Sequence, residues 1–241
     1  MSSVPYDEWV DYIEKIWSKN GKKVKMVLEL ACGTGNVSIR LAKKGYEVIA
    51  LDKSEDMLAE AKNKATDMGL DILFLNQDMC DFELYGSVDS IICLCDSINY
   101  ITDENELLNV FKLCNNYLNP GGLFIFDVNT IYKYEKILSD NSFSESTETA
   151  AYTWENYYDS EKNINEYYVN FFIEDNKSGL YERFEEYHYQ KAYTENVISS
   201  LIEKAGMKVT GIFNEMEFCA PFKESQRVFF VAEEIKKLKG K

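Results

Sequence analysis

The sequence predicts an α/β fold in which a mostly parallel sheet has helices on both faces and an antiparallel β segment is inserted into the chain. Short apolar runs alternate with segments of helical periodicity through the first half. From Tyr152 to Tyr193, 13 of 42 residues are aromatic and no helical period emerges. A helix pattern and two strand patterns then return. The 241 residues therefore suit one domain that carries a lobe.

Five apolar runs in the first half are predicted to form strands. In chain order they are residues 26–30, 47–52, 72–75, 90–94 and 123–127. The fourth run carries so little charge that both of its faces should be covered, which is typical of a parallel sheet.

Helices are predicted before and between these strands. They cover residues 37–44, 55–68 and 103–118, preceded by an amphipathic helix that starts at Tyr6. Ser54 is placed to cap the start of one helix, and Gly45 and Gly69 follow the ends of two. This alternation of strand and helix indicates parallel pairing.

The aromatic segment is predicted to form three antiparallel strands joined by polar turns, at residues 152–157, 167–173 and 181–189. A helix over 194–205 and strands over 208–213 and 227–232 follow. We therefore predict a core built from residues 1–135 and 194–241, in which residues 1–20 form a covering helix. Residues 136–193 form the inserted β subdomain.

The composition argues against three classes of function: nucleic-acid binding, membrane insertion and metal binding. The 26 basic and 41 acidic residues give a net charge of −15, so the surface repels phosphates and nucleic acid is not expected as a partner. No run approaches the roughly 18 uncharged apolar residues of a membrane helix, and no signal segment opens the chain, so we expect a cytoplasmic protein. The six cysteines include no Cys-x-x-Cys pair and His188 is the single histidine, so no metal site is predicted.

The loop after the first predicted strand is a candidate nucleotide-binding turn. It reads Glu29-Leu30-Ala31-Cys32-Gly33-Thr34-Gly35 and is followed by a helix. The dinucleotide fingerprint Gly-x-Gly-x-x-Gly fails, because Ser38 occupies its third position. An acid two positions before a Gly-x-Gly-x-Gly loop, here with alanine at the first glycine, instead resembles motif I of the class I S-adenosylmethionine-dependent methyltransferases. The resemblance implies that S-adenosylmethionine (SAM) contacts Glu29, Ala31, Gly33 and Gly35.

Further marks of that family follow in register. Asp52 ends the second strand, where its carboxylate would accept both ribose hydroxyls, although dinucleotide-binding folds also have an acid there. The resemblance implies that Lys53 and Met57 lie in the segment whose methionine packs on adenine. A core position would fit Met57 nearly as well. The resemblance further implies that Asp78 and the backbone of Met79 hold the adenine amino group.

Other residues are assigned to the amino-acid end of the cofactor. The resemblance places the Cys95 backbone there, at the end of the fourth strand. In similar bacterial methyltransferases a Tyr-x-x-Trp helix lies over the cofactor, which assigns Tyr6 and Trp9 as covers. Ordinary helix packing is the alternative for both.

The acceptor side is less defined. The resemblance implies that Asn99 and Tyr100 face the methyl group, although a turn and a packed aromatic explain them equally. The Asn-Pro-Pro-Tyr sequence of enzymes that methylate bases or glutamine is absent, which favours a small molecule. Alternation places His188 on one face of an inserted strand, and histidine is the side-chain type whose unperturbed pKa lies near neutrality, so His188 is the candidate general base. A structural histidine is the alternative.

We therefore predict a Rossmann-like, seven-stranded class I methyltransferase with an inserted antiparallel β lid. It would methylate an unidentified small molecule, with an amine preferred, by in-line displacement. The family's strand order would place residues 227–232 antiparallel between the fifth strand and residues 208–213. Two alternatives stay open: a nicotinamide-dependent oxidoreductase, and a non-catalytic SAM-binding module. The aromatic insertion would also suit a contact in a homo-oligomer.

Overall fold

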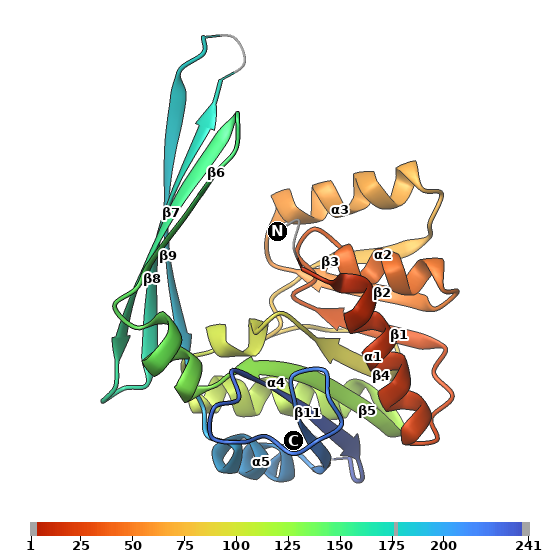
Figure 1. The fold of residues 1–241 in the computed structure, drawn as a ribbon. Coiled ribbons are helices and arrows are strands. Elements are labelled where there is room, and N and C mark those ends of the chain that lie inside the picture. Colours follow the sequence, from red (N-terminus) through yellow and green to blue (C-terminus); the bar gives the residue numbers. More distant parts are fainter. Residues whose placement is uncertain (1–3, 176–177, 238–241) are drawn as a thin grey trace.

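The computed structural model describes residues 4–175 and 178–237. The two ends of the predicted core, residues 1–3 and 238–241, lie outside this range. The described chain contains a seven-stranded sheet and a separate four-stranded sheet (Figure 1).

The larger sheet has the strand order β10-β11-β5-β4-β1-β2-β3. The strands are β1 Met26–Leu30, β2 Glu47–Asp52, β3 Ile72–Asn76, β4 Val88–Cys93, β5 Leu118–Asn129, β10 Met207–Asn214 and β11 Arg227–Glu234. β11 pairs antiparallel with both β5 and β10, and all other neighbours pair parallel. This confirms the predicted seven-stranded sheet and the position of its last strand.

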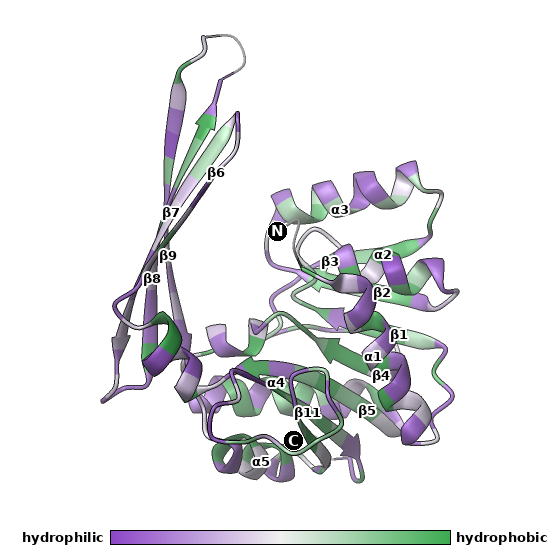
Figure 2. Ribbon diagram, in the orientation of Figure 1, coloured by the Kyte–Doolittle hydropathy of each residue, from purple (hydrophilic) through white to green (hydrophobic). Residues whose placement is uncertain are grey.

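Helices cover both faces of this sheet. They are α1 Tyr6–Lys19, α2 Asn36–Lys43 and α3 Glu55–Asp67 on one face, and α4 Glu104–Tyr117 and α5 Glu195–Lys204 on the other. The side chains of Ser54, Asp103 and Thr194 accept hydrogen bonds from first-turn amides, as N-caps do. Figure 2 shows hydrophobic residues concentrated in the strands between the two helix layers. Burial of this apolar surface stabilises the layered fold.

The smaller sheet has the order β6-β7-β8-β9 and extends away from the larger one (Figure 1). Its antiparallel strands are β6 Ser142–Ser146, β7 Ala150–Asp159, β8 Ile164–Glu174 and β9 Tyr181–Lys191. The three predicted strands are confirmed, but β6 was missed. All five of its residues are exposed and only Phe143 is apolar, so β6 has no alternating pattern to detect.

A short π-helix at Lys133–Leu138, also missed, lies at the base of the smaller sheet. Tyr134 and Leu138 of this helix form a small core with Tyr158, Tyr167 and Ala192. The smaller sheet is therefore attached to the domain by apolar packing of its own.

β5 begins at Leu118, five residues before the predicted start. The sequence Asn119-Pro120-Gly121-Gly122, between the predicted helix and the predicted strand, lies inside the irregular start of β5, where the pairing with β4 shifts register. A Cβ on Gly122 would lie 2.9 Å from the backbone oxygens of Asn119 and Asp89. Glycine is needed there for close approach of the backbones.

Candidate active site

The loop between β1 and α2 contains residues in the left-handed backbone region. Ala31, Gly33 and Gly35 have φ values of 52°, 53° and 75°. A Cβ on Gly35 would lie 3.0 Å from the Cβ of Ala61 in α3. Ala31 stands where the family pattern has glycine and therefore holds backbone strain of about 1 kcal/mol. The loop lies at the carboxyl end of β1, the edge at which open parallel sheets bind ligands.

The carboxylate of Asp52 is held against this loop. Asp52 ends β2 and is 9% exposed. Its Oδ2 accepts a hydrogen bond from the Gly33 amide at 2.8 Å, and its Oδ1 accepts one from the Ser54 amide at 2.9 Å. Each oxygen keeps a second lone pair and can still accept a ligand hydroxyl. The structure thus brings together the glycine loop and the predicted ribose acid.

Met57 lies beside the loop. Its side chain is 48% exposed, and a Cβ on Gly33 would lie 3.7 Å from its sulfur. Met57 is therefore not a core residue, which was the alternative for it. Its thioether is available to a flat ring placed against the loop.

The segment after β3 lies next to Asp52. The Gln77 amide donates to the Asp52 carbonyl oxygen at 3.2 Å. Asp78 Oδ1 accepts a hydrogen bond from the Cys80 amide at 2.8 Å, and Met79 packs partly buried against the core on the α4 side. Lys53 is exposed after β2. The Gln77 amide thus joins the segment that carries Asp78 and Met79 to the end of the Asp52 strand.

Glu29 lies beneath the loop and is buried. The Ser38 hydroxyl of α2 donates a hydrogen bond to Glu29 Oε2. Burial raises the pKa of Glu29 to about 8, against the opposing effect of the Ser38 hydrogen bonds. Glu29 thus ties β1 to α2 and supports the loop from inside.

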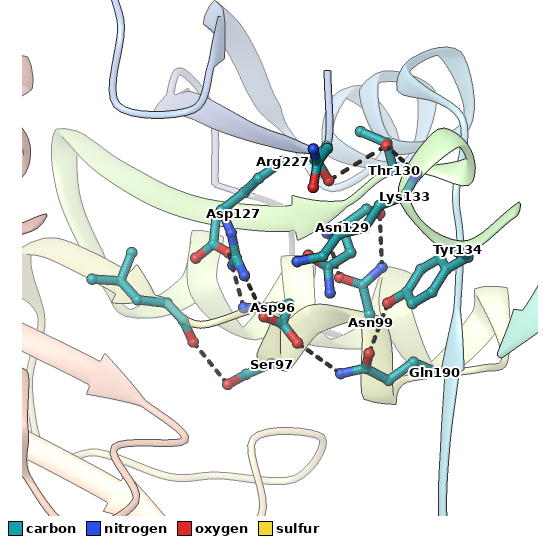
Figure 3. Close-up of polar contacts among 12 residues, drawn as sticks. Asp96, Ser97, Asn99, Asp127, Asn129, Thr130, Lys133, Tyr134, Gln190 and Arg227 are labelled. Atoms are coloured by element: carbon teal, nitrogen blue, oxygen red, sulfur yellow. Dashed lines mark hydrogen bonds and ion pairs between the residues drawn. The ribbon is translucent and has the colours of Figure 1, made fainter. Parts of the chain in front are cut away.

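The end of β4 is fixed by an ionic cluster (Figure 3). Cys95 and Asp96 have φ values of 58° and 52°, so two successive residues are in the left-handed region. The Asp96 amide donates to Asp127 Oδ2 at 2.9 Å, and Arg227 Nη2 donates to Asp96 Oδ1 at 2.8 Å. Arg227 Nη1 also donates to Asp127 Oδ2. Because both carboxylates compensate for its burial, the pKa of Arg227 is raised.

Sequence reasoning missed Asp127 and Arg227 as site residues. Asp127 is fully buried, and its Oδ1 has no hydrogen-bond partner among the described residues. Burial raises the pKa of Asp127, and the charge of Arg227 opposes this rise. Asp127 does lie near the end of a predicted central strand, which was a usable signal. Arg227 on β11 is 100 residues from Asp127 in the chain, so no motif spacing in the sequence indicates that the two residues pair.

Asn99 is buried and its amide is committed to the fold. Its Nδ2 donates to the carbonyl oxygens of Asn129 at 3.2 Å and Lys191 at 2.8 Å, and its Oδ1 accepts from the Asn129 amide at 2.9 Å. This side chain joins the ends of β5 and β9 (Figure 3 shows Asn99 and Asn129). Its contacts favour the turn role over contact with a methyl acceptor.

Tyr100 of the segment after β4 meets His188 of the inserted sheet. Tyr100 lies in the short 3₁₀ helix Ser97–Tyr100 after β4, and its ring meets the His188 ring edge-on, with centroids 5.8 Å apart. Glu186 Oε2 lies 2.9 Å from His188 Nε2. Burial, with the negative charges of Asp96 and Glu186, raises the pKa of Tyr100 to about 12. Tyr100 therefore stays a neutral hydroxyl at physiological pH.

The two predicted covering residues of α1 differ in placement. Tyr6 is partly exposed, and burial together with nearby Cys95 raises its pKa. Trp9 is 5% exposed and packs between Phe229, at 5.8 Å, and the guanidinium of Arg227, at 5.2 Å from its ring. The Trp9 ring thus packs against Arg227 of the ionic cluster.

The arrangement fits the adenosine part of SAM. A left-handed loop without bulky side chains, a carboxylate with free lone pairs, and an exposed thioether lie together at one sheet edge. In the described parts of the chain, no three His, Cys, Asp or Glu side chains are grouped to hold a metal. Nor is any helix of residues 4–175 and 178–237 long and apolar enough to cross a membrane.

Comparison with known proteins agrees with this geometry. A family model described as a methyltransferase domain matches residues 27–122. The chain is 33% identical over 237 residues to "Putative methyltransferase YqeM" of Bacillus subtilis (strain 168), covering 98% of this chain and 93% of the relative. The crystal structure of a SAM-dependent methyltransferase from Clostridium acetobutylicum has a TM-score of 0.89 and 32% identity, over 97% of this chain and 93% of that one.

A more distant structure shares the fold. It is SAM-bound CalS10, an amino pentose methyltransferase from Micromonospora echinaspora. Its TM-score is 0.77 at 15% identity, and the match covers 97% of this chain and 93% of that one.

Proposed function

The chain belongs to the family of SAM-dependent methyltransferases, and we propose that it methylates the amine of a small molecule bound between the cofactor site and the inner face of the smaller sheet. The contact between Tyr100 and His188, at 5.8 Å between ring centroids, carries this proposal. It brings a titratable side chain of the inserted sheet to the end of β4. Because the chain belongs to this family, we no longer propose a nicotinamide-dependent oxidoreductase.

SAM supplies, when bound, an electrophilic methyl group with a neutral thioether as leaving group. We assign Asp52 to the ribose hydroxyls and the loop backbone at Ala31 and Gly33 to close contact with the nucleoside. Met57 and the segment at Asp78 line the adenine. The proposal is supported by the carboxylate geometry of Asp52 and by the exposed sulfur of Met57.

His188 is proposed to remove a proton from the acceptor. Aliphatic ammonium groups have pKa values of about 10, so an amine arrives mostly protonated and cannot act as a nucleophile. His188 Nε2 is bound to Glu186, and no hydrogen bond is found at Nδ1 among the described residues. Glu186 would hold the proton on Nε2, so that Nδ1 can accept the proton of the ammonium. The freed nitrogen lone pair is then available for methyl transfer.

The surrounding charge favours a cationic acceptor. Asp96 and Glu186 both act on Tyr100, and the chain has a net charge of −15. A negative site attracts an ammonium group and raises its local concentration. The Tyr100 hydroxyl can orient the acceptor without carrying charge. A cytoplasmic location and self-association through the smaller sheet stay predictions.

The test is transfer of labelled methyl from SAM into a bacterial metabolite extract separated by ion exchange into cationic, neutral and anionic pools. We expect label in the cationic pool, on nitrogen. Label confined to the neutral or anionic pool would overturn the amine proposal. SAM binding without label in any pool would favour the non-catalytic module.

A further inference from the structure

We propose that Gln190 is a positioning residue that sets the inserted sheet, and with it His188, against the end of β4. This inference rests on the proposed function, because it concerns the placement of the proposed base. Gln190 lies on β9, two residues after His188. Alternate residues of a strand share a face, so the contact of one fixes the position of the other.

Gln190 uses both ends of its buried amide. It is 1% exposed. Nε2 donates to Asp96 Oδ2 at 2.8 Å, while Oε1 accepts from the hydroxyl groups of Tyr134 at 2.8 Å and Tyr167 at 2.6 Å. Figure 3 shows Gln190 between Asp96 and Tyr134. One side chain thus joins the β4 loop, the π-helix and β8.

The direction of the amide follows from its partners. A tyrosine hydroxyl has one hydrogen to donate, and two hydroxyls converge on the same atom of Gln190. That atom is best assigned as the carbonyl oxygen. The amide nitrogen then points at the Asp96 carboxylate, which can only accept. In the reverse orientation the amide could donate to both hydroxyls, but its carbonyl oxygen would face the Asp96 carboxylate, so the contact with Asp96 decides the orientation.

Asp96 is a firm anchor for this contact. Its second oxygen is bound by Arg227, and its backbone amide is bound by Asp127. The left-handed backbone at Cys95 and Asp96 is held by these bonds. Ligand binding that orders this segment should therefore be transmitted through Gln190 to β9.

The variant Gln190→Glu tests the contact with almost no change in shape. The two tyrosine hydroxyls can still donate to the new side chain, but its other oxygen faces the Asp96 carboxylate. Two adjacent carboxylates, one buried and one partly buried, cannot both ionise easily, so one takes up a proton at a raised pKa. When protonated, the new carboxyl group donates to Asp96 as the amide does. The contact should therefore be lost at high pH and restored at low pH.

Several ionisable groups lie around residue 190, and their charges set the pH at which the contact of Gln190→Glu with Asp96 is half restored. They are Asp96, Tyr100, Asp127, Lys133, Tyr134, Tyr167, Glu186, His188 and Arg227. The wild-type amide does not titrate, so comparison with wild type at each pH removes the background from these groups.

The experiment measures hydrogen exchange of the β9 amides with and without S-adenosylhomocysteine, at about pH 8 and about pH 6. Calorimetry at both pH values confirms that the compound is bound. The proteins are wild type, Gln190→Glu, Gln190→Leu and, as a matched control at an exposed glutamine, Gln226→Glu. We expect bound compound to slow β9 exchange about tenfold in wild type and in the control at both pH values.

In Gln190→Glu the slowing should be absent at the higher pH and present at the lower pH. In Gln190→Leu it should be absent at both. Equal slowing in wild type and Gln190→Leu would overturn the proposal, as would equal slowing in wild type and Gln190→Glu with its carboxyl group ionised, and so would no slowing in wild type with the compound bound. If Gln190→Leu does not fold, Gln190→Glu alone decides. Because no acceptor is used, failure of the amine proposal in the extract assay leaves this result unaffected.

Discussion

Ser38 of α2 donates a hydrogen bond to the buried carboxyl group of Glu29 on β1. The residue that breaks the dinucleotide pattern is thus the partner of the acid that begins the methyltransferase motif. A third glycine at position 38 would leave the Glu29 carboxyl group buried without this hydrogen bond. The two sequence patterns exclude one another here for a structural reason.

Glu29→Gln should change the pH dependence of stability. The folded-state pKa of Glu29 is raised to about 8, so the folded protein holds a proton that the unfolded chain releases at lower pH. This stability is fully present below the unfolded pKa and is lost as pH rises through about 8. Glutamine is neutral at every pH, so the Glu29→Gln variant does not lose stability in this way as the pH rises. Denaturation midpoints of wild type should therefore fall relative to Glu29→Gln as pH rises, and parallel curves would contradict the assignment.

Asp52→Ala should weaken SAM binding by about 10- to 100-fold while leaving the fold intact. The substitution removes an acceptor held between the Gly33 and Ser54 amides. Titration calorimetry measures the change, and Asp56→Ala in the first turn of α3 is the matched control. An affinity equal to that of wild type would refute the ribose assignment.

Ala31→Gly should stabilise the protein by about 0.5–1 kcal/mol, because glycine adopts the φ of 52° without strain. Ala42→Gly in the helix α2 is the control with the opposite sign, since glycine destabilises a helix interior by about 1 kcal/mol. Urea denaturation of both variants gives the comparison. Destabilisation in both would show that residue 31 is not strained.

Arg227→Met should destabilise the fold by about 3–5 kcal/mol, because it leaves the buried Asp127 without its cation. Arg40→Met breaks an exposed ion pair with Asp7 and should cost about 1 kcal/mol or less. Adding Asp127→Asn to Arg227→Met should recover part of the loss. A double variant that is no more stable than Arg227→Met would argue against an uncompensated charge as the cause.

His188→Gln should reduce methyl transfer into the cationic pool by about 100-fold, the lower end of the range for a general base. SAM affinity should be unchanged, because His188 lies on the inserted sheet. Tyr189→Phe, on the opposite face of β9, should behave as wild type. An equal loss of activity in His188→Gln and Tyr189→Phe would show that the sheet is damaged and that loss of a base is not the cause.

The α/β core, its seven strands and the glycine turn after β1 could be predicted from the amino-acid sequence alone. These features are local: apolar runs, cap residues and a glycine turn occur within a few neighbouring residues, and the physical preferences of those residues survive in the fold. The same is true of Asp52, which ends a strand next to the loop. Even β6 was missed for a local reason, because its exposed serines and single glutamate give no hydrophobic period.

The contacts around the proposed acceptor site could be found only in the folded structure. Arg227 meets Asp127 and Asp96 across 100 and 131 residues of chain, and Gln190 meets Asp96 across 94. Tyr100 comes from the 3₁₀ helix after β4 and His188 from the inserted sheet, and their rings meet only because the small core at Tyr134 fixes how that sheet is attached. Pairing between distant residues depends on chain closure and packing, and no spacing in one sequence encodes it.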